Sequence, residues 1–351
     1  MIFGPRNQIV GLDIGSRAIK AAEAVETKKG WELKKFGSVE IEPGAVEEGV
    51  IKNPDVLSNA INQLFDLYNI KKKNVAISIG GYSVIVKNIN VQKMPEEQLV
   101  ESLSFEAEQY IPFDINDVNI DFQMLGENEQ NPNQMGVMLV AAKKDMINDY
   151  INLIDSAQLN LCIIDIDAFA LQNIYEVNYG EQGANVALID IGASKTSVNI
   201  LKGNTSVFLR DVSLGCTQIN ERIASIANCS LAEAEVLRQQ EAPDKISPEN
   251  LTQVFSSVVN DWCDEIGRAL DFFKSTNPDE EMKHIVLSGG GANIKEFREL
   301  LAMQTSAEVN VINPFESFSI GNNQLDDAYL KQIAPQAAIA MGLALRRVDD
   351  K

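Results

Sequence analysis

The chain has 351 residues, 45% of them hydrophobic, which is enough apolar material for a folded core and about two domains of ~150 residues. Its 50 acidic and 30 basic residues give a net charge of -20, which argues against general nucleic-acid binding. The only histidine, His284, excludes a multi-histidine metal site, and the four cysteines form no CxxC motif.

The sequence shows no targeting or membrane segment. The start, MIFGPRNQIVGLDIG, lacks the apolar region and the small-residue cleavage site of a signal peptide. The longest apolar run near the end, AAIAMGLAL, has nine residues, whereas a membrane span needs ~20. We therefore expect a soluble, cytoplasmic protein that reaches a membrane only through a partner.

The first 83 residues alternate between strand-like and helical patterns. Short apolar runs predict strands at Gln8–Leu12, Ala18–Val25 and Asn74–Ile79. An extended segment spans Trp31–Ile41, and Asn53-Pro54 opens an amphipathic helix.

Residues 84–160 form a module inserted into the first half. Its predicted elements are strand Val84–Val91, helix Pro95–Tyr110, strand Val118–Leu125, loop Gly126–Gln134, strand Gly136–Ala142 and helix Lys143–Ala157. The loop, GENEQNPNQ, is polar and rich in turn-forming residues. We expect it to be the most mobile part of the chain.

The rest of the chain repeats the alternation of strands and helices. Strands are predicted at Leu161–Asp165, Asn185–Ile189, Ser197–Leu201 and His284–Leu287. Helices are predicted at Asp167–Val177, Gly215–Ala227, Leu231–Gln239 and Pro248–Ser275, from Ala292, and at Gln336–Leu345. This alternation is typical of an α/β fold.

One short motif occurs twice. Leu12-Asp13-Ile14-Gly15-Ser16 recurs as Ile189-Asp190-Ile191-Gly192-Ala193, each time between two predicted strands. Each half therefore opens with a β-hairpin whose tight turn carries Asp and Gly. The duplication predicts two similar halves that face each other.

These two turns and a third, Ser288–Gly291, have the composition of phosphate-binding turns. Glycine lets backbone N–H groups approach phosphate oxygens closely. Ser16 can add a hydroxyl donor, and Lys20 can reach back to a phosphate. One carboxylate from each half, Asp13 and Asp190, would hold hydrated Mg²⁺ between them.

Other nucleotide motifs are absent from the sequence. The Walker A pattern GxxxxGK[ST] is not matched around Lys195-Thr196, and there is no GxGxxG. A single glycine turn is most often an ordinary tight turn. Two aligned copies and a third turn favour phosphate binding over coincidence.

The motifs resemble those of the actin-like ATPase superfamily. GLDIGSRAIKAAE is similar to its first phosphate motif, ALIDIGASKTSVNIL to its second, and IVLSGGGANI to its adenosine motif. DIDAFALQN and PQAAIAMGLAL resemble the two connecting helices. The resemblance implies an α/β actin-like fold of two facing duplicated halves that binds ATP and Mg²⁺.

The resemblance also implies a set of site residues. Asp13 and Asp190 would serve catalysis and hold Mg²⁺ through water. The implied cofactor-binding residues are Gly15, Ser16, Arg17, Lys20, Gly192, Ala193, Ser194, Thr196, Glu235, Arg238, Gly289, Gly290 and Gly291. The segment EAEVLR resembles a base- and ribose-contacting helix, but it also fits a surface helix with i,i+3 charge pairs.

A longer stretch is more specific. MPEEQLVESLSFEAEQYIPFDINDVNIDFQML and GVMLVAAKKDMINDYINLIDSAQLNLCIIDIDAFAL resemble the type IV pilus assembly protein PilM family. The inserted module is similar in position to that of the division protein FtsA. In actin-like terms, the resemblance assigns subdomain 1A to residues 1–83, 161–184 and 333–351, an inserted subdomain 1C to 84–160, and subdomains 2A and 2B to 185–332.

Members of this family bind the short cytoplasmic N-terminal tail of a single-span membrane protein, PilN. The resemblance implies a cytoplasmic, ATP-binding adaptor that is peripheral on the inner membrane and supports pilus assembly and twitching motility. Pilus motor ATPases are further expected partners, and self-association is compatible with this role. The tail would lie in a groove lined by Val84–Val91 and Leu99–Tyr110, unless these apolar residues form the module's own core.

The second phosphate motif departs from that of active superfamily members. Where many of them have a second acid or a Gly-Gly pair, this chain has Ala193 and Ser194, so one candidate for orienting the attacking water is missing. Lys195 is unusual beside a phosphate turn, and strand alternation predicts that it points outward. We expect ATP binding with slow or negligible hydrolysis.

Two alternatives stay open. An FtsA-like filament protein often ends in an amphipathic membrane-binding helix, whereas this chain ends RRVDDK. A small-molecule kinase of the superfamily needs a substrate-binding acid in the cleft, and the sequence offers no clear candidate.

Overall fold

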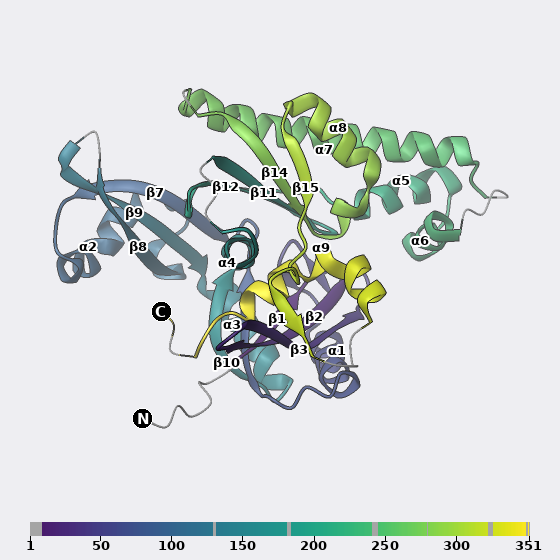
Figure 1. Ribbon diagram of the computed structural model, residues 1–351, viewed down its shortest axis with the longest axis horizontal. Coiled ribbons are helices and arrows are strands. Elements are labelled where there is room, and N and C mark those ends of the chain that lie inside the picture. The colour runs from purple at the N-terminus through teal and green to yellow at the C-terminus, as the bar shows by residue number, and fades with distance from the viewer. Residues whose placement is uncertain are drawn as a thin grey trace.

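Two β-sheets form the centre of the molecule, one in each half (Figure 1). The computed structural model describes residues 9–128, 131–180, 184–240, 245–278, 280–321, 326–348 and 350. In this part of the chain none of the helices has the length and apolar character of a membrane span.

The two sheets share one plan. The first contains, in spatial order, β10 (Asn160–Ile166), β6 (Asn74–Ile79), β1 (Val10–Ile14), β2 (Ala18–Thr27), β3 (Gly30–Glu40) and β16 (Phe318–Ile320). The second contains β13 (Thr205–Val212), β12 (Thr196–Lys202), β11 (Asn185–Ile191), β14 (Met282–Ser288) and β15 (Glu308–Val311). In each sheet the repeated hairpin, β1–β2 or β11–β12, is antiparallel, and its first strand also pairs with a parallel strand. The Asp-x-Gly turns therefore lie at the carboxyl ends of parallel strands.

Helices α4 (Asp167–Tyr179) and α9 (Asp327–Leu343) lie between the two halves (Figure 1). Small residues let them approach closely, since a Cβ on Gly342 would lie 1.8 Å from the Ala170 carbonyl oxygen. The predicted start of α9 at Gln336 is wrong. The helix begins at Asp327, where Asp326 caps it, and Pro335 lies inside it although proline usually ends a helix.

The remaining large helices cover the outer faces of the sheets. α1 (Pro54–Leu67) and α3 (Lys144–Ser156) share a hydrophobic core with the first sheet. α5 (Thr217–Ala227), α6 (Leu231–Gln240), α7 (Pro248–Thr276) and α8 (Lys295–Thr305) contribute to the core of the second half. Each amphipathic helix thus buries its apolar face against one half, which leaves the space between the halves to α4 and α9.

The inserted module projects to the side of the second half in Figure 1. Its sheet has the order β7-β9-β8, formed by Val84–Gln92, Asn131–Lys143 and Val118–Asn128, and it is covered by α2 (Glu96–Glu108). The predicted loop Gly126–Gln134 is largely wrong, because β8 and β9 continue into it and pair Asn128 with Asn131. Residues 129–130 lie outside the described part. The side chains at the hairpin end are exposed or half-buried, so polar residues are tolerated there. The strands are held together by backbone pairing and show no apolar alternation at this end.

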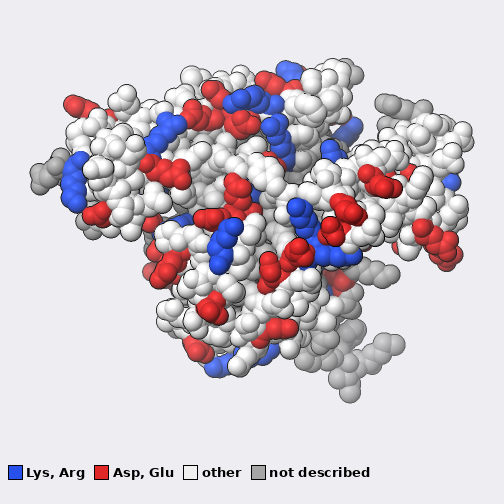
Figure 2. Space-filling model, turned by 180° about the vertical axis from the view of Figure 1, so that it is seen from behind, with Lys and Arg blue, Asp and Glu red and all other residues white. Residues whose placement is uncertain are grey.

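Several elements were not predicted from the sequence. These are strands β13, β15 and β16, the small hairpin of β4 (Val46–Glu47) and β5 (Val50–Ile51), and the 3-10 turns η1 (Ile115–Asp117) and η2 (Gly290–Asn293). On the face shown in Figure 2, acidic and basic side chains are interspersed, without a continuous basic surface among the residues described there. That face has the mixed charge of an ordinary solvated surface.

Candidate functional site

A cavity of about 340 Å³, here called the cleft, lies between the two halves. Its lining comes from the carboxyl ends of β1, β6 and β11, from the N-terminal end of α4, and from α6 and α9. In open α/β sheets this is the edge at which ligands bind. The volume is also in the range of small-molecule sites.

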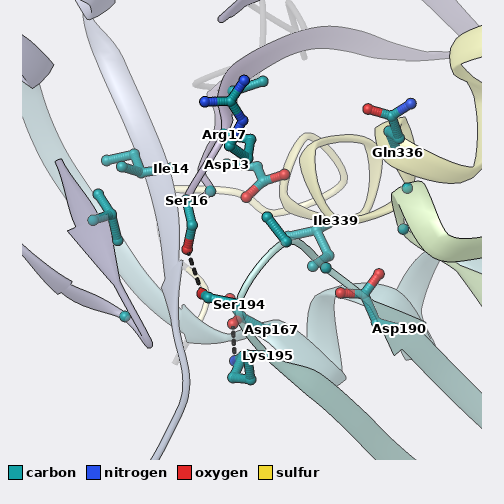
Figure 3. A pocket seen from close by; sticks show the side chains of 18 of the residues that line it. Asp13, Ile14, Ser16, Arg17, Asp167, Asp190, Ser194, Lys195, Gln336 and Ile339 are labelled. Atoms are coloured by element: carbon teal, nitrogen blue, oxygen red, sulfur yellow. Dashed lines mark hydrogen bonds and ion pairs between the residues drawn. The ribbon is translucent and has the colours of Figure 1, made fainter. Parts of the chain in front are cut away.

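The two repeated turns meet across the cleft. Gly15 donates its N–H to the carbonyl three residues later at 3.2 Å, and Gly192 does the same at 2.9 Å. The hydroxyls of Ser16 and Ser194 are 2.7 Å apart and join the turns directly (Figure 3). The structure therefore brings both predicted phosphate turns to one place.

The two predicted catalytic carboxylates face the cleft from opposite halves (Figure 3). Asp13 is buried and pairs with Lys20, whose Nζ lies 3.0 Å from Asp13 Oδ2. Burial raises the pKa of Asp13, and Lys20 offsets only part of this effect. Burial also raises the pKa of Asp190 to about 6, although a hydrogen bond from Ser288 acts in the opposite direction.

The third glycine turn forms the end of the cleft next to α9. Gly289 has a φ of 81°, and a Cβ there would lie 2.3 Å from the Ile191 carbonyl oxygen. A Cβ on Gly290 would meet no protein atom, so this backbone faces open space. Gln336 and Ile339 of α9 line the same part of the cleft.

An ion pair crosses the cleft between the halves. Arg17 follows the first phosphate turn, and its guanidinium donates to both carboxylate oxygens of Glu235 on α6, at 2.8 and 2.6 Å. Arg238 lies 3.8 Å from the same carboxylate. The i,i+3 pair predicted for a surface helix is thus present, but it lines the cleft and contacts the first half.

Lys195 corrects one prediction. Its side chain points into the molecule rather than outward, with Nζ 2.7 Å from Asp167 Oδ2 (Figure 3). The same Nζ lies 3.4 Å from Asp211 Oδ2. Burial alone would raise the pKa of Asp167, but the charge and hydrogen bond of Lys195, together with Ser78, leave it below the usual value. Strand alternation does not apply to Lys195, because this residue lies in the turn and β12 begins only at Thr196.

Asp167 is an acid in the cleft that the sequence analysis did not find. It is the first residue of α4, directly after β10, and β10 runs parallel to β6 in the same sheet as β1. The DIDAFALQN motif contained the signal, since an acid after a parallel strand lies at the same edge as Asp13. Its hydroxyl partner is Ser78 at the end of β6, with Oγ 2.6 Å from Asp167 Oδ1.

Most of the predicted site residues line the cleft, but two pack beside it. Thr196 is fully buried and donates its hydroxyl to the Leu214 carbonyl at 3.0 Å. A Cβ on Gly291 would lie 2.4 Å from Ile191 Cγ2, so this glycine serves close packing. Lining residues that were not predicted include Ser78, Gly80, Tyr150, Asp167, Lys195, Cys216, Gln336 and Ile339.

A second cavity, of about 190 Å³, lies where the inserted module joins the rest of the molecule. We call it the module-foot cavity. Its apolar lining is Val84, Ile85, Val86, Ile166, Ala168 and Leu209, and its charged lining is two acids, Asp167 and Asp211, and one lysine, Lys87. The predicted groove residues Leu99 and Leu103 lie instead in the module's own core. Of the two proposed linings, only the start of β7 faces this cavity.

Comparison with known proteins places this geometry in a family. A family model described as type IV pilus assembly protein PilM matches residues 11–348. A solved structure described as a PilM-PilN type IV pilus biogenesis complex is 28% identical with a TM-score of 0.87, over 99% of this chain and 100% of that chain.

More distant structures share the fold. The ethanolamine utilization protein EutJ from Carboxydothermus hydrogenoformans is 13% identical with a TM-score of 0.59, over 98% of this chain and 90% of that one. MreB5 of Spiroplasma citri bound to ADP is 13% identical with a TM-score of 0.51, over 90% and 93% of the two chains. These likenesses confirm the predicted α/β actin-like fold. Because the family match spans nearly the whole sequence, the chain belongs to the type IV pilus assembly protein PilM family.

Proposed function

We propose that this chain is an ATP-binding adaptor that holds the cytoplasmic N-terminal tail of a PilN-type membrane protein. The observation that carries the proposal is the likeness, over both full lengths, to a chain described as part of a PilM-PilN complex. The adaptor would sit at the cytoplasmic face of the inner membrane through this partner. Pilus motor ATPases would meet its other surfaces.

The cleft suits a nucleoside triphosphate. Lys20 and Arg17 supply positive charge, and the N–H groups of the glycine turns are donors for phosphate oxygens. The open space at Gly290 would accept the flat face of a base. The residues that would hold ATP are the cleft-lining residues of the three turns, with Glu235 and Arg238 of α6.

Asp13 and Asp190 are the carboxylates that would face a Mg²⁺ ion. In the described part of the chain no three His, Cys, Asp or Glu side chains are grouped to hold a metal. A Mg²⁺ ion would therefore depend on phosphate oxygens and water as well as on these two carboxylates, as is usual for this ion. When bound, it would neutralise part of the phosphate charge.

Hydrolysis by this site would be slow. Asp167 is the acid placed to orient a water molecule, but its carboxylate is engaged by Lys195 and Ser78. An acid held by a cation is a weak proton acceptor, since its pKa lies below the usual value. We therefore expect the nucleotide to act mainly through binding.

The module-foot cavity is the proposed place for the tail. Val84, Val86 and Leu209 offer apolar contacts, and Asp211 offers a carboxylate. An extended peptide whose apolar residues enter such a pocket gains specificity from the pocket and affinity from burial.

Calorimetric titration of a synthetic peptide with the N-terminal sequence of the PilN-type protein from the same organism tests the proposal. We expect micromolar binding to the full chain, and a loss of about tenfold or more in Val86→Asp, which places a charge in the apolar lining. Val100→Asp is the matched control, because Val100 is exposed on α2. Absence of binding, or equal losses in both variants, would contradict the proposed function.

A further inference from the structure

One lysine ties together both halves and the inserted module. Lys195 Nζ contacts Asp167 of the first half at 2.7 Å and Asp211 on β13 of the second half at 3.4 Å. Asp211 also accepts the N–H of Gly81 at 2.6 Å, and Gly81 lies just before β7. A change at the ammonium group is therefore transmitted by direct contact to the entrance of the module.

The same cluster separates the two cavities. Gly80 and Asp167 line both the cleft and the module-foot cavity, whereas Lys195 lines the first and Asp211 the second. The backbone of Lys195 belongs to the second glycine turn, where its carbonyl accepts the N–H of Gly192. The ammonium group thus stands between the phosphate turns and the proposed peptide site.

The cluster carries one positive and two negative charges. Burial alone would lower the pKa of Lys195, but Asp167 and Asp211 outweigh it and raise the pKa above the usual value, so the lysine is charged at neutral pH. Charges in such a mostly buried place interact strongly, because solvent screens them little. A phosphate entering the cleft therefore competes directly with these carboxylates for the ammonium group.

We propose that Lys195 couples the two cavities: the terminal phosphate of a bound nucleoside triphosphate draws the ammonium group away from Asp167 and Asp211, and the uncovered carboxylates strengthen binding of a positively charged peptide in the module-foot cavity. This inference rests on the proposed function, because it takes the tail of the membrane partner as the peptide.

The positive charge expected of the tail explains why the nucleotide should strengthen peptide binding rather than weaken it. Cytoplasmic segments next to membrane spans are rich in Lys and Arg. Carboxylates that have lost their cation attract such a segment, while Val84, Val86 and Leu209 accept its apolar part. A diphosphate lacks the terminal phosphate and has a smaller effect. By linkage the peptide strengthens triphosphate binding by the same factor.

The test is calorimetric titration of the PilN-type peptide into the full chain without nucleotide, with saturating Mg-ADP and with a saturating non-hydrolysable Mg-ATP analogue. We expect the analogue to tighten peptide binding by about fivefold or more. In Lys195→Met the effect falls to less than about twofold, because the carboxylates have no cation to lose. Nucleotide binding is titrated separately for each variant, so that saturation is known.

Two further variants separate this effect from general damage. Lys202→Met removes a lysine from the same hairpin that pairs with Glu280 outside both cavities, and it is expected to keep the wild-type ratio. Gly80→Ala keeps every charge, but its Cβ would lie 2.2 Å from Lys195 Nζ and 2.5 Å from Asp167 Oδ2. It therefore separates the pair through flexible side-chain ends, which raises peptide affinity without nucleotide and lowers the ratio.

Each outcome is decisive. Peptide affinities that differ by less than about twofold with and without the analogue in the wild type overturn the coupling and leave the proposed function intact. A wild-type ratio retained in Lys195→Met overturns the role of this lysine. A peptide that binds in none of the nucleotide states overturns the proposed function, and the inference falls with it.

Discussion

The two central hairpins have the same backbone but place their lysines differently. In the first, Lys20 lies opposite Asp13 across the β1–β2 pair, and the two side chains form an ion pair. In the second, Ser197 lies opposite Asp190, and the lysine is Lys195 in the turn. Its ammonium group leaves the hairpin and contacts the other half of the molecule.

This difference shows that one duplicated turn can serve two purposes. In the first hairpin, Lys20 partly compensates the charge of Asp13, so the lysine and the carboxylate that it offsets belong to the same hairpin. The second hairpin uses its lysine as a bridge between halves, and the carboxylate of Asp190 is left with a strongly raised pKa. The two turns share the hydrogen bond from the glycine N–H to the carbonyl three residues later, whereas their lysines contact different carboxylates.

Removing Lys20 is expected to have the largest effect. Lys20→Met leaves the buried carboxylate of Asp13 without its partner, and breaking a buried ion pair in this way costs about 3–5 kcal/mol. We expect the free energy of unfolding of the nucleotide-free protein at neutral pH to fall by about 4 kcal/mol. Urea denaturation measures this change.

The double variant Asp13→Asn, Lys20→Met is the control for that experiment. It removes the uncompensated charge, so it should recover most of the lost stability. An unchanged urea midpoint in Lys20→Met would show that Lys20 does not compensate the charge of Asp13.

Asp190 should make the stability of the protein depend on pH, which allows a second test of the difference between the hairpins. Burial raises its pKa from the ordinary 3.8 to about 6 in the folded protein. Folding therefore favours the protonated form, and this contribution to stability is complete below about pH 4 and is lost as the pH rises through 6. A shift of this size corresponds to up to about 3 kcal/mol. We expect Asp190→Asn to stabilise the nucleotide-free protein at pH 7 by up to that amount and to flatten the stability profile between about pH 4 and 7.

The matched variant is Asp13→Asn. Burial also raises the pKa of Asp13, but Lys20 offsets part of this effect, so Asp13→Asn should stabilise the protein at pH 7 by less than Asp190→Asn does. Urea denaturation across the pH range compares the two. A gain in Asp13→Asn as large as that in Asp190→Asn would refute the difference between the hairpins.

The sequence predicted the features that depend on local pattern. The repeated Asp-x-Gly turn between apolar runs indicated the α/β fold and the facing hairpins, because both turn and strand signals lie within a few residues. Strands β15 and β16 were missed because they are short, and β16 also pairs with β3, which is distant in the chain. The two strands of the module hairpin were predicted, but its end was taken for a loop, because polar residues suit an exposed strand end as well as they suit a loop.

The same limit applies to the site, where local motifs were predicted and contacts between distant motifs were not. Residues inside the motifs could be assigned from their spacing, but the contact of Lys195 with Asp167 joins two motifs from different halves. The direction of the Lys195 side chain depends on the residue at which β12 begins, and the position of Asp167 depends on the edge of the sheet at which β10 ends. Neither is determined by a local sequence pattern. Asp211 lies on β13, a strand that the sequence analysis did not predict.

Thr196 offers the smallest and most specific test of the comparison. It lies opposite Ile191, as Ile19 lies opposite Ile14 in the first hairpin, and its buried hydroxyl bonds to the Leu214 carbonyl. Thr196→Val should cost about 1 kcal/mol of stability, the value of one hydrogen bond, and change nucleotide affinity by less than about twofold.

Ser16→Ala is the counterpart of this variant, because the Ser16 hydroxyl lines the cleft. It should weaken nucleotide binding several-fold, because the hydroxyl would donate to a bound phosphate, and it should cost no more than about 1 kcal/mol of stability, because the half-buried hydroxyl also bonds to Ser194. Urea denaturation and nucleotide titration of both variants separate the two effects. If Thr196→Val weakened nucleotide binding more than Ser16→Ala did, the Thr196 hydroxyl would act on the nucleotide, and the second hairpin would hold phosphate in a way that the first, with isoleucine at that position, cannot.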